Sequence, residues 1–259
     1  MIRVVSRSVG CAVIFLTVFS ASLATEWGDL SGRFVYEGKP PERAKLNVNK
    51  DVDIFGKLDL RDESLIVAPD GGIANVLVYV RTKKVPVHPD YAKTADAKVT
   101  IANKGGRFDP HILPIRLSQT LVITNGDRCG HNSNLQPIAD AGINPLITEG
   151  GQVEHRFNRP QNIPVPISCN IHPWMKGYIL PRRNPYVAVS GPDGTFKLKN
   201  VPAGMELEFQ VWQERAGYVT KAIVAGKPVA WKRGRFKMTL KPGENDLGTI
   251  KLPAEIFNK

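Results

Sequence analysis

The sequence I-S-C-N-I-H-P-W-M-K-G-Y, residues 167–178, places three metal-binding side chains in one short stretch. They are Cys169, His172 and Met175, spaced as Cys-x-x-His-x-x-Met. A thiolate, an imidazole and a thioether are donors that copper prefers and that hard cations do not. Electron-transfer copper sites use two histidines, one cysteine and a weak axial methionine. The stretch therefore predicts a copper site that takes one more histidine from elsewhere in the chain.

His131 is the expected second histidine. It lies upstream in N-G-D-R-C-G-H-N-S-N, shortly after the apolar, strand-like run 121–124. One ligand at a strand end and three in a loop converge only if the strands that carry them are neighbours. The sequence thus predicts that the segments around His131 and Cys169 lie side by side.

Short runs with strand-like patterning fill most of the chain. Apolar and polar residues alternate in D-L-S-G-R-F-V-Y (29–36), and I-A-N-V-L-V-Y-V-R (73–81) is rich in β-branched residues. Turns such as P-D-G-G and P-A-G separate the runs. No long window shows a helical apolar period, so the expected fold class is all-β. A further weak strand is expected at residues 64–68.

The central part of the chain resembles the cupredoxins, in particular small blue copper proteins of the amicyanin and plastocyanin type. The matching words are F-D-P-H-I-L-P-I-R-L-S-Q-T-L-V-I-T-N-G-D-R-C-G-H-N (108–132) and C-N-I-H-P-W-M-K-G (169–177). The resemblance implies a Greek-key β-sandwich over about 97–180. Within it, His131, Cys169 and His172 would be strong copper ligands, with Met175 axial. Asn132 would tie the two ligand segments together.

This sequence departs from the cupredoxin pattern at two positions. Ser118 stands where the family usually has glycine before the strand, and Cys129 lies two residues before the expected ligand His131. His111, in F-D-P-H, is interpreted as a side chain packed or hydrogen-bonded beside a strand, and a role as a fifth ligand or in a second metal site is the alternative.

The two ends of the chain resemble a carboxypeptidase regulatory-like (transthyretin-like) β-sandwich. Its opening words occur as G-R-F-V-Y-E-G-K-P-P (32–41) and A-N-V-L-V-Y-V (74–80), and its later words as S-G-P-D-G-T-F-K-L-K-N-V-P-A-G (190–204) and F-Q-V-W (209–212). We interpret this as one sandwich, split into residues 25–96 and 185–259, with a copper domain at 97–184 inserted between its second and third strands. Three consecutive small β units are the alternative. Proteins with this layout are often labelled methylamine-utilisation-like, but no residue here indicates amine chemistry.

The N-terminus has the pattern of a secretory signal peptide. A basic region precedes the apolar run C-A-V-I-F-L-T-V-F-S, and small residues follow up to Ala24. We expect cleavage after Ala24 and a periplasmic or secreted protein. The mature chain would keep two cysteines, Cys129 and Cys169, so a disulfide between them is an alternative that would remove the thiolate ligand.

The chain carries a formal net charge of +11. A nucleic-acid partner is not expected, because the basic residues are spread out and no binding module is recognisable. The charge is consistent with a solvated surface, or with steering toward an acidic redox partner or an anionic envelope surface, without spanning a membrane. Arg182 and Arg183, shortly after the ligand loop, are candidates for that steering.

Three functions are compatible with these residues. The leading hypothesis is an exported type 1 copper protein that carries single electrons and is not an enzyme, because four protein ligands leave no open position for a substrate. A metal-free secreted interaction module with a Cys129–Cys169 disulfide is the second. Copper storage or delivery through the same ligands is the third.

Overall fold

The computed structural model describes Met1 and residues 25–258. The signal peptide expected at residues 1–24 lies outside this described part, apart from Met1. Within the described part, no helix is long and apolar enough to cross a membrane. The fold is all-β, as the strand patterning predicts. Among residues 25–258, the helical elements are α1 (Val52–Phe55) and three short 3₁₀ segments, Pro89–Thr94, Lys232–Gly234 and Ala254–Phe257.

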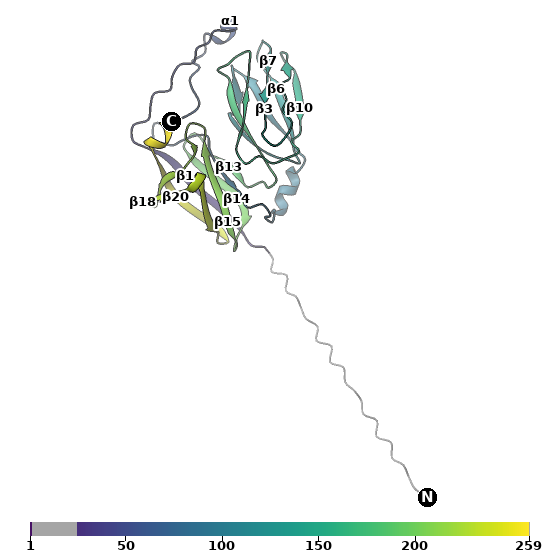
Figure 1. The fold of residues 1–259 in the computed structure, drawn as a ribbon, viewed down its shortest axis with the longest axis vertical. Helices are drawn as coiled ribbons and strands as arrows, with labels where there is room; N and C mark the ends of the chain where they lie inside the picture. The colour runs from purple at the N-terminus through teal and green to yellow at the C-terminus, as the bar shows by residue number, and fades with distance from the viewer. Residues whose placement is uncertain (2–24, 259) are drawn as a thin grey trace.

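One β-sandwich, here called the outer sandwich, is built from both ends of the chain (Figure 1). Its first sheet has the order β14-β1-β20-β17-β18. These strands are Thr195–Pro202, Trp27–Glu37, Gly243–Pro253, Lys221–Val224 and Lys227–Ala230. Its second sheet has the order β13-β2-β15-β16, with β19 beside β15. These strands are Val187–Val189, Val76–Val80, Glu206–Gln213, Gly217–Tyr218 and Arg235–Thr239.

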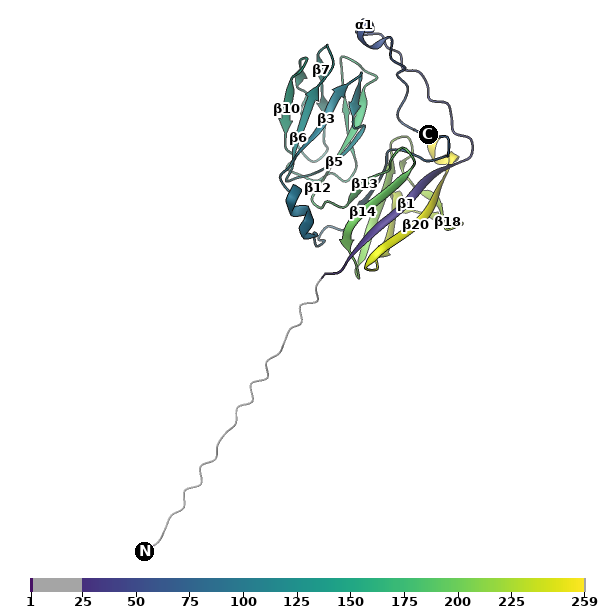
Figure 2. The ribbon, with the colours of Figure 1, turned by 180° about the vertical axis from the view of Figure 1, so that it is seen from behind.

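A second β-sandwich, here called the central sandwich, lies between these two parts of the chain in sequence (Figure 2). One sheet has the order β10-β6-β3-β4, formed by Gln152–His155, Thr120–Asn125, Lys98–Lys104 and Arg107–Asp109. The other has the order β5-β12-β11-β8, formed by Ile112–Arg116, Lys176–Arg182, Val165–Ser168 and Asn134–Leu135. A small pair, β7 (His131–Asn132) and β9 (Leu146–Ile147), lies beside them.

The two sandwiches pack against each other through β2. Every residue of this strand is buried, because both of its faces are covered. Val76, Val78 and Val80 point into the core of the outer sandwich. Leu77 and Tyr79 instead join a cluster with residues of the central sandwich, Ile112 and Leu180 among them. Burial on both faces explains why the sequence of β2 is a continuous apolar run rather than an alternating one.

Arg182 closes the junction between the sandwiches. Its guanidinium donates to the carbonyl of Val80 at 2.7 Å and to that of Gln161 at 3.0 Å. It also lies over the ring of Tyr79, 5.1 Å from the centroid. The expectation that Arg182 steers a partner is therefore wrong, because the side chain is buried and its donors point inward. Arg183, the next residue, is exposed.

The connection from β1 to β2, residues 38–75, forms a long arm. It leaves the outer sandwich and reaches the end of the central sandwich that carries β7 (Figures 1 and 2). An isolated bridge pairs Lys45 with Arg61, and Arg107 of the central sandwich forms a 3.0 Å ion pair with Glu63 of the arm. The weak strand expected at residues 64–68 does not form, and one isolated bridge between Val67 and Ile73 stands in its place.

Candidate metal centre

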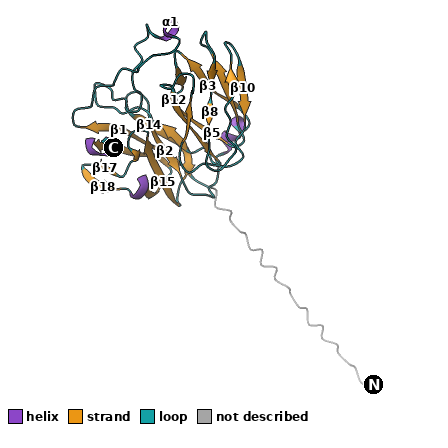
Figure 3. Cartoon of the chain, turned by 45° about the horizontal axis from the view of Figure 1, so that its top comes forward, coloured by secondary structure: helices purple, strands orange, loops and turns teal. Residues whose placement is uncertain are grey.

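Strand pairing brings the two expected ligand segments together. β11 pairs antiparallel with β8, so that Ile167 lies opposite Leu135 and Ser168 opposite Asn134. Cys169 follows β11 directly, and His131 in β7 slightly precedes β8. Figure 3 labels β8, β12 and β5, which belong to one sheet of the central sandwich together with β11.

Three of the four expected donors form a compact triangle. The Nδ1 atoms of His131 and His172 are 3.0 Å apart, and the Sγ of Cys169 lies 3.8 Å and 3.6 Å from them. A point at the centre of this triangle is about 2 Å from each atom, close to the usual length of metal–imidazole and metal–thiolate bonds. The geometry therefore fits one metal ion. All three residues are almost fully buried.

Met175, the fourth expected donor, lies in the same loop and is 1% exposed. Its N–H donates to the carbonyl of His172 at 2.9 Å, and its own carbonyl accepts from the N–H of Cys169 at 3.3 Å. These bonds fold the loop back on itself. Met175 and Cys169 belong to one apolar cluster of the central sandwich.

In each histidine, the nitrogen that faces away from the triangle, Nε2, is hydrogen-bonded to a carboxylate. His131 Nε2 donates to Asp127 Oδ2 at 3.1 Å, and His172 Nε2 donates to Asp51 Oδ2 at 2.7 Å. Each bond fixes the ring and leaves Nδ1 turned inward, which also makes the imidazole a stronger donor. Asp127 lies four residues before His131, a local signal that sequence reasoning missed. Asp51 comes from the distant arm, and no sequence motif indicates it.

Asn132 links the two ligand segments, as the cupredoxin resemblance implies. Its side-chain oxygen accepts from the N–H of Asn170 at 2.8 Å and from that of Ile171 at 3.3 Å. The same oxygen is 3.4 Å from the sulfur of Cys169. One amide thus holds the loop and β7 in register.

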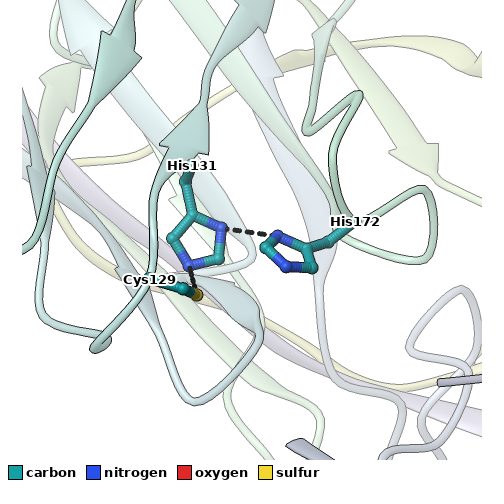
Figure 4. Close-up of side chains that lie close together, drawn as sticks. All are labelled: Cys129, His131 and His172. Atoms are coloured by element: carbon teal, nitrogen blue, oxygen red, sulfur yellow. Dashed lines mark hydrogen bonds between the residues drawn. The ribbon is translucent and has the colours of Figure 1, made fainter. Parts of the chain in front are cut away.

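Cys129 and Cys169 are both free thiols in the structure. Cys129, His131 and His172 do form a group with candidate donor atoms within 4.8 Å of one another. However, the sulfur of Cys129 lies 3.6 Å from Nε2 of His131, on the side of the ring away from His172 (Figure 4). Asp127 already contacts that nitrogen. Cys169, which faces both Nδ1 atoms, is therefore the better third donor.

The protonation states suit metal binding by Cys169 rather than Cys129. Burial alone would raise the pKa of Cys169, but hydrogen bonds from His131 and from backbone amides lower it. Burial, reinforced by Asp51 and Asp127, raises the pKa of Cys129 to about 11. Cys129 therefore stays a neutral thiol, whereas Cys169 has the thiolate character that a metal ligand needs.

The two histidines differ in protonation. Burial would lower the pKa of His131, but its hydrogen bonds to Asp127 and Cys169 raise it to about 9. Burial lowers the pKa of His172, and the charge of His131 lowers it further despite Asp51. In the metal-free protein His131 is therefore the more readily protonated of the two imidazoles.

His111 lies outside the triangle. Its Nε2 is 2.6 Å from a carboxylate oxygen of Glu214 and its Nδ1 is 3.7 Å from one of Glu63. His111 belongs to the central sandwich, Glu63 to the arm and Glu214 to the outer sandwich. The residue thus packs between two carboxylates where the three parts meet, in agreement with its interpretation as a packed side chain.

Comparison with known proteins returns copper proteins among solved structures. A copper-containing nitrite reductase from Thermus scotoductus SA-01 is 24% identical at a TM-score of 0.31, over 33% of this chain and 22% of that chain. A purple cupredoxin from Nitrosopumilus maritimus is 27% identical at a TM-score of 0.28, over 34% of this chain and 100% of that one. A Cu(I) form of an amicyanin mutant is 15% identical at a TM-score of 0.31, over 40% and 98%.

This chain thus spans about a fifth of the nitrite reductase chain. No family model and no curated protein matches the sequence.

Proposed function

We propose that this protein is an exported copper protein that carries single electrons. The observation that carries the proposal is the buried triangle formed by two imidazole nitrogens and one sulfur. His131, Cys169 and His172 would bind the ion, with Met175 as the axial ligand. Soft and borderline donors of this kind suit copper. Because four protein donors leave no position for a substrate, we propose a carrier and not an enzyme.

The chain contributes rigidity, charge and exclusion of water. Copper would supply the one-electron change between its two oxidation states. Asp127 and Asp51 hold the histidine rings, and Asn132 holds the loop, so that the donors need not move when the charge of the site changes. The apolar cluster around Cys169 and Met175 keeps water away from the sulfur atoms.

We propose that residues 97–184 are the copper domain and that residues 25–96 and 185–259 together form one split sandwich of the carboxypeptidase regulatory-like type. The pairing of β1 with β14 and β20, and of β2 with β13 and β15, supports this division. A cleaved signal peptide at residues 1–24 would deliver the protein to the periplasm or beyond. An acidic redox protein would suit its net positive charge.

A visible spectrum of the purified mature protein with added copper(II) tests the ligand set. An intense thiolate-to-copper band is expected, which disappears in Cys169→Ser and His131→Ala but remains in Cys129→Ser. Free-thiol quantification before copper is added should find two thiols, Cys129 and Cys169. A band that is lost in Cys129→Ser and kept in Cys169→Ser would contradict the proposal, as would a disulfide without any colour.

Copper storage or delivery is the second candidate function, because His172 is fully buried instead of presenting its edge to solvent. An electron carrier needs a short path to its partner, whereas a storage protein does not. Tight binding of copper(I) without a stable coloured copper(II) form would favour storage.

A further inference from the structure

The arm covers the outer edge of His172. A ligand that binds metal through Nδ1 points its Nε2 edge away from the ion, toward the surface. Asp51 of the arm accepts the hydrogen bond from that nitrogen at 2.7 Å. The ring of Phe55, in α1, stands edge-on to His172 with centroids 5.2 Å apart. Both His172 and Phe55 are 0% exposed, so the arm removes this edge from solvent.

The ring of Phe55 packs against a site on the central sandwich, here called its seat, which is formed by Gly106 and Trp174. The turn between β3 and β4 carries Gly106 in the left-handed region, at φ +69°, and a Cβ there would lie 3.1 Å from the Phe55 ring. Trp174 forms another wall, with its ring centroid 6.0 Å from that of Phe55 and its indole N–H donating to the Gly106 carbonyl at 3.2 Å. A glycine is required because a side chain would strain the backbone and crowd Phe55.

The same turn also supports the other histidine. The N–H groups of Gly105 and Gly106 donate to the two oxygens of Asp127 at 2.6 Å and 3.1 Å, and Asp127 holds His131. The two histidines are therefore braced differently. The Nε2 atom of His131 is bonded to Asp127 of the central sandwich, whereas that of His172 is bonded to Asp51 of the arm, in the connection between β1 and β2.

We propose that residues 50–60 of the arm are a built-in cap on the His172 edge. Phe55 excludes water and other molecules from the imidazole, and Asp51 is a positioning residue that fixes its ring. The covering of His172 follows from the contacts alone. The consequence for electron transfer rests on the proposed function. In that role the cap blocks direct encounter at His172, so that electrons enter through the arm or after the arm has moved.

Chemical modification of the metal-free protein tests the cap without copper. Diethyl pyrocarbonate acylates accessible imidazoles, and the modified peptides can be followed by mass spectrometry. His88 serves as an internal reference because its side chain is 21% exposed. In the unmodified sequence His172 should react far more slowly than His88, and Phe55→Ala should accelerate it at least about tenfold by opening the seat. Leu58→Ala, at an exposed arm residue, should leave the rate unchanged.

Circular dichroism separates opening of the cap from unfolding, and Phe55→Leu provides a milder variant that keeps the seat apolar. Faster reaction of His172 in folded Phe55→Ala, with an intermediate rate in Phe55→Leu, supports the cap. Reaction of His172 as fast as His88 in the unmodified sequence would overturn it. So would an unchanged rate in folded Phe55→Ala.

Copper-loaded protein then tests the electron-transfer consequence. Phe55→Ala should speed oxidation of the reduced protein by ferricyanide with little change in reduction potential. Asp51→Asn should raise the potential, because it removes a negative charge beside His172 and weakens its donation to copper(II). Asp53→Asn, two residues away and exposed, is the matched control and should have little effect. Unchanged rate and potential in the two test variants would overturn the cap's role in electron transfer. If no variant binds copper, the proposed function fails, while the modification result still decides whether the cap exists.

Discussion

The two sandwiches of this chain place their buried polar groups very differently. Among the described residues, most buried polar side chains lie in the central sandwich. They are Asn103, Thr120, Asn125, Asp127, His131, Asn132, Ser133, Gln161, His172, Arg182 and Asn184. The outer sandwich buries Ser190, Gln210 and Gln213. Its core is otherwise a continuous apolar cluster.

Buried polar groups cost free energy unless they are fully hydrogen-bonded. Asp127, His131, Asn132 and His172 surround the triangle of donors, and their burial there indicates function rather than stability. Gln161 and Arg182 instead form hydrogen bonds at the junction of the two sandwiches. The outer sandwich instead has an apolar core, one strand that is buried on both faces, and an arm that reaches the site. Substitutions in the core of the outer sandwich should therefore change the free energy of unfolding without changing the metal site.

The largest expected effect is on the scaffold. Phe209 is 0% exposed in the outer core and stacks on Phe236 with centroids 5.2 Å apart. Phe209→Ala should lower the free energy of unfolding by about 4 kcal/mol through lost burial and a cavity. Urea unfolding of the metal-free protein measures this. The copper band of the folded variant should keep its position, and a shifted band would break the separation of scaffold from site.

The next effect is at the junction. Arg182→Met removes two hydrogen bonds from a buried guanidinium to carbonyls and should cost about 2–3 kcal/mol. Arg183→Met, at the exposed neighbour, should change the free energy of unfolding by less than about 0.5 kcal/mol. Calorimetry of both variants compares them, and the Arg182 variant should show less coupling between the sandwiches. Equal stabilities for the two variants would contradict the junction role of Arg182.

A smaller effect is expected at the site. Asn132→Ala removes the acceptor of the Asn170 and Ile171 amides, which should cost about 2 kcal/mol. The copper band should broaden because the ligand loop is no longer held against β7. Asn162→Ala, at an exposed residue of the central sandwich, is the matched control. Equal spectra for the two variants would show that the loop is held by its own backbone bonds.

Most of the central sandwich was predictable because its information is local. The Cys-x-x-His-x-x-Met spacing places its donors on one loop, and the strand before His131 is continuous and apolar. The all-β class followed from alternation and turn residues. In β2 the same patterning predicted a strand. Its continuous apolar run is typical of a strand with two buried faces, but the run does not identify the central sandwich as the element that covers one of them.

Asp51 and Phe55 could not be predicted from the sequence. Residues 42–66 are polar and irregular, so they gave no pattern, and their role depends on where a long connection ends in space. The expectation that Arg182 steers a partner was wrong for a related reason. Its position after the ligand loop suggested exposure, whereas the packing of β12 against β2 turned it inward. In each case the deciding contact joins segments that are far apart in the sequence.

The pH dependence of metal binding sharpens the comparison within the site. With the pKa of His131 raised to about 9, copper must displace a proton from this imidazole at neutral pH. The apparent copper affinity should therefore rise by up to about tenfold per pH unit between about pH 7 and 8 and level off near 9. Competition titrations with copper(I) measure the slope. Asp127→Asn should flatten it, since the carboxylate helps to hold the proton, and a flat slope in the unmodified sequence would contradict the assignment.

The smallest expected effect concerns His111. Because its ring lies between Glu63 and Glu214 rather than in the triangle, His111→Gln should leave the copper band unchanged. The variant should lose about 1 kcal/mol of stability, since glutamine keeps a hydrogen-bond donor for only part of this contact. A spectrum and a urea titration on the same preparation are sufficient. A shifted or weakened band would mean that the junction of arm, central sandwich and outer sandwich reaches the metal, and that scaffold and site are coupled through His111.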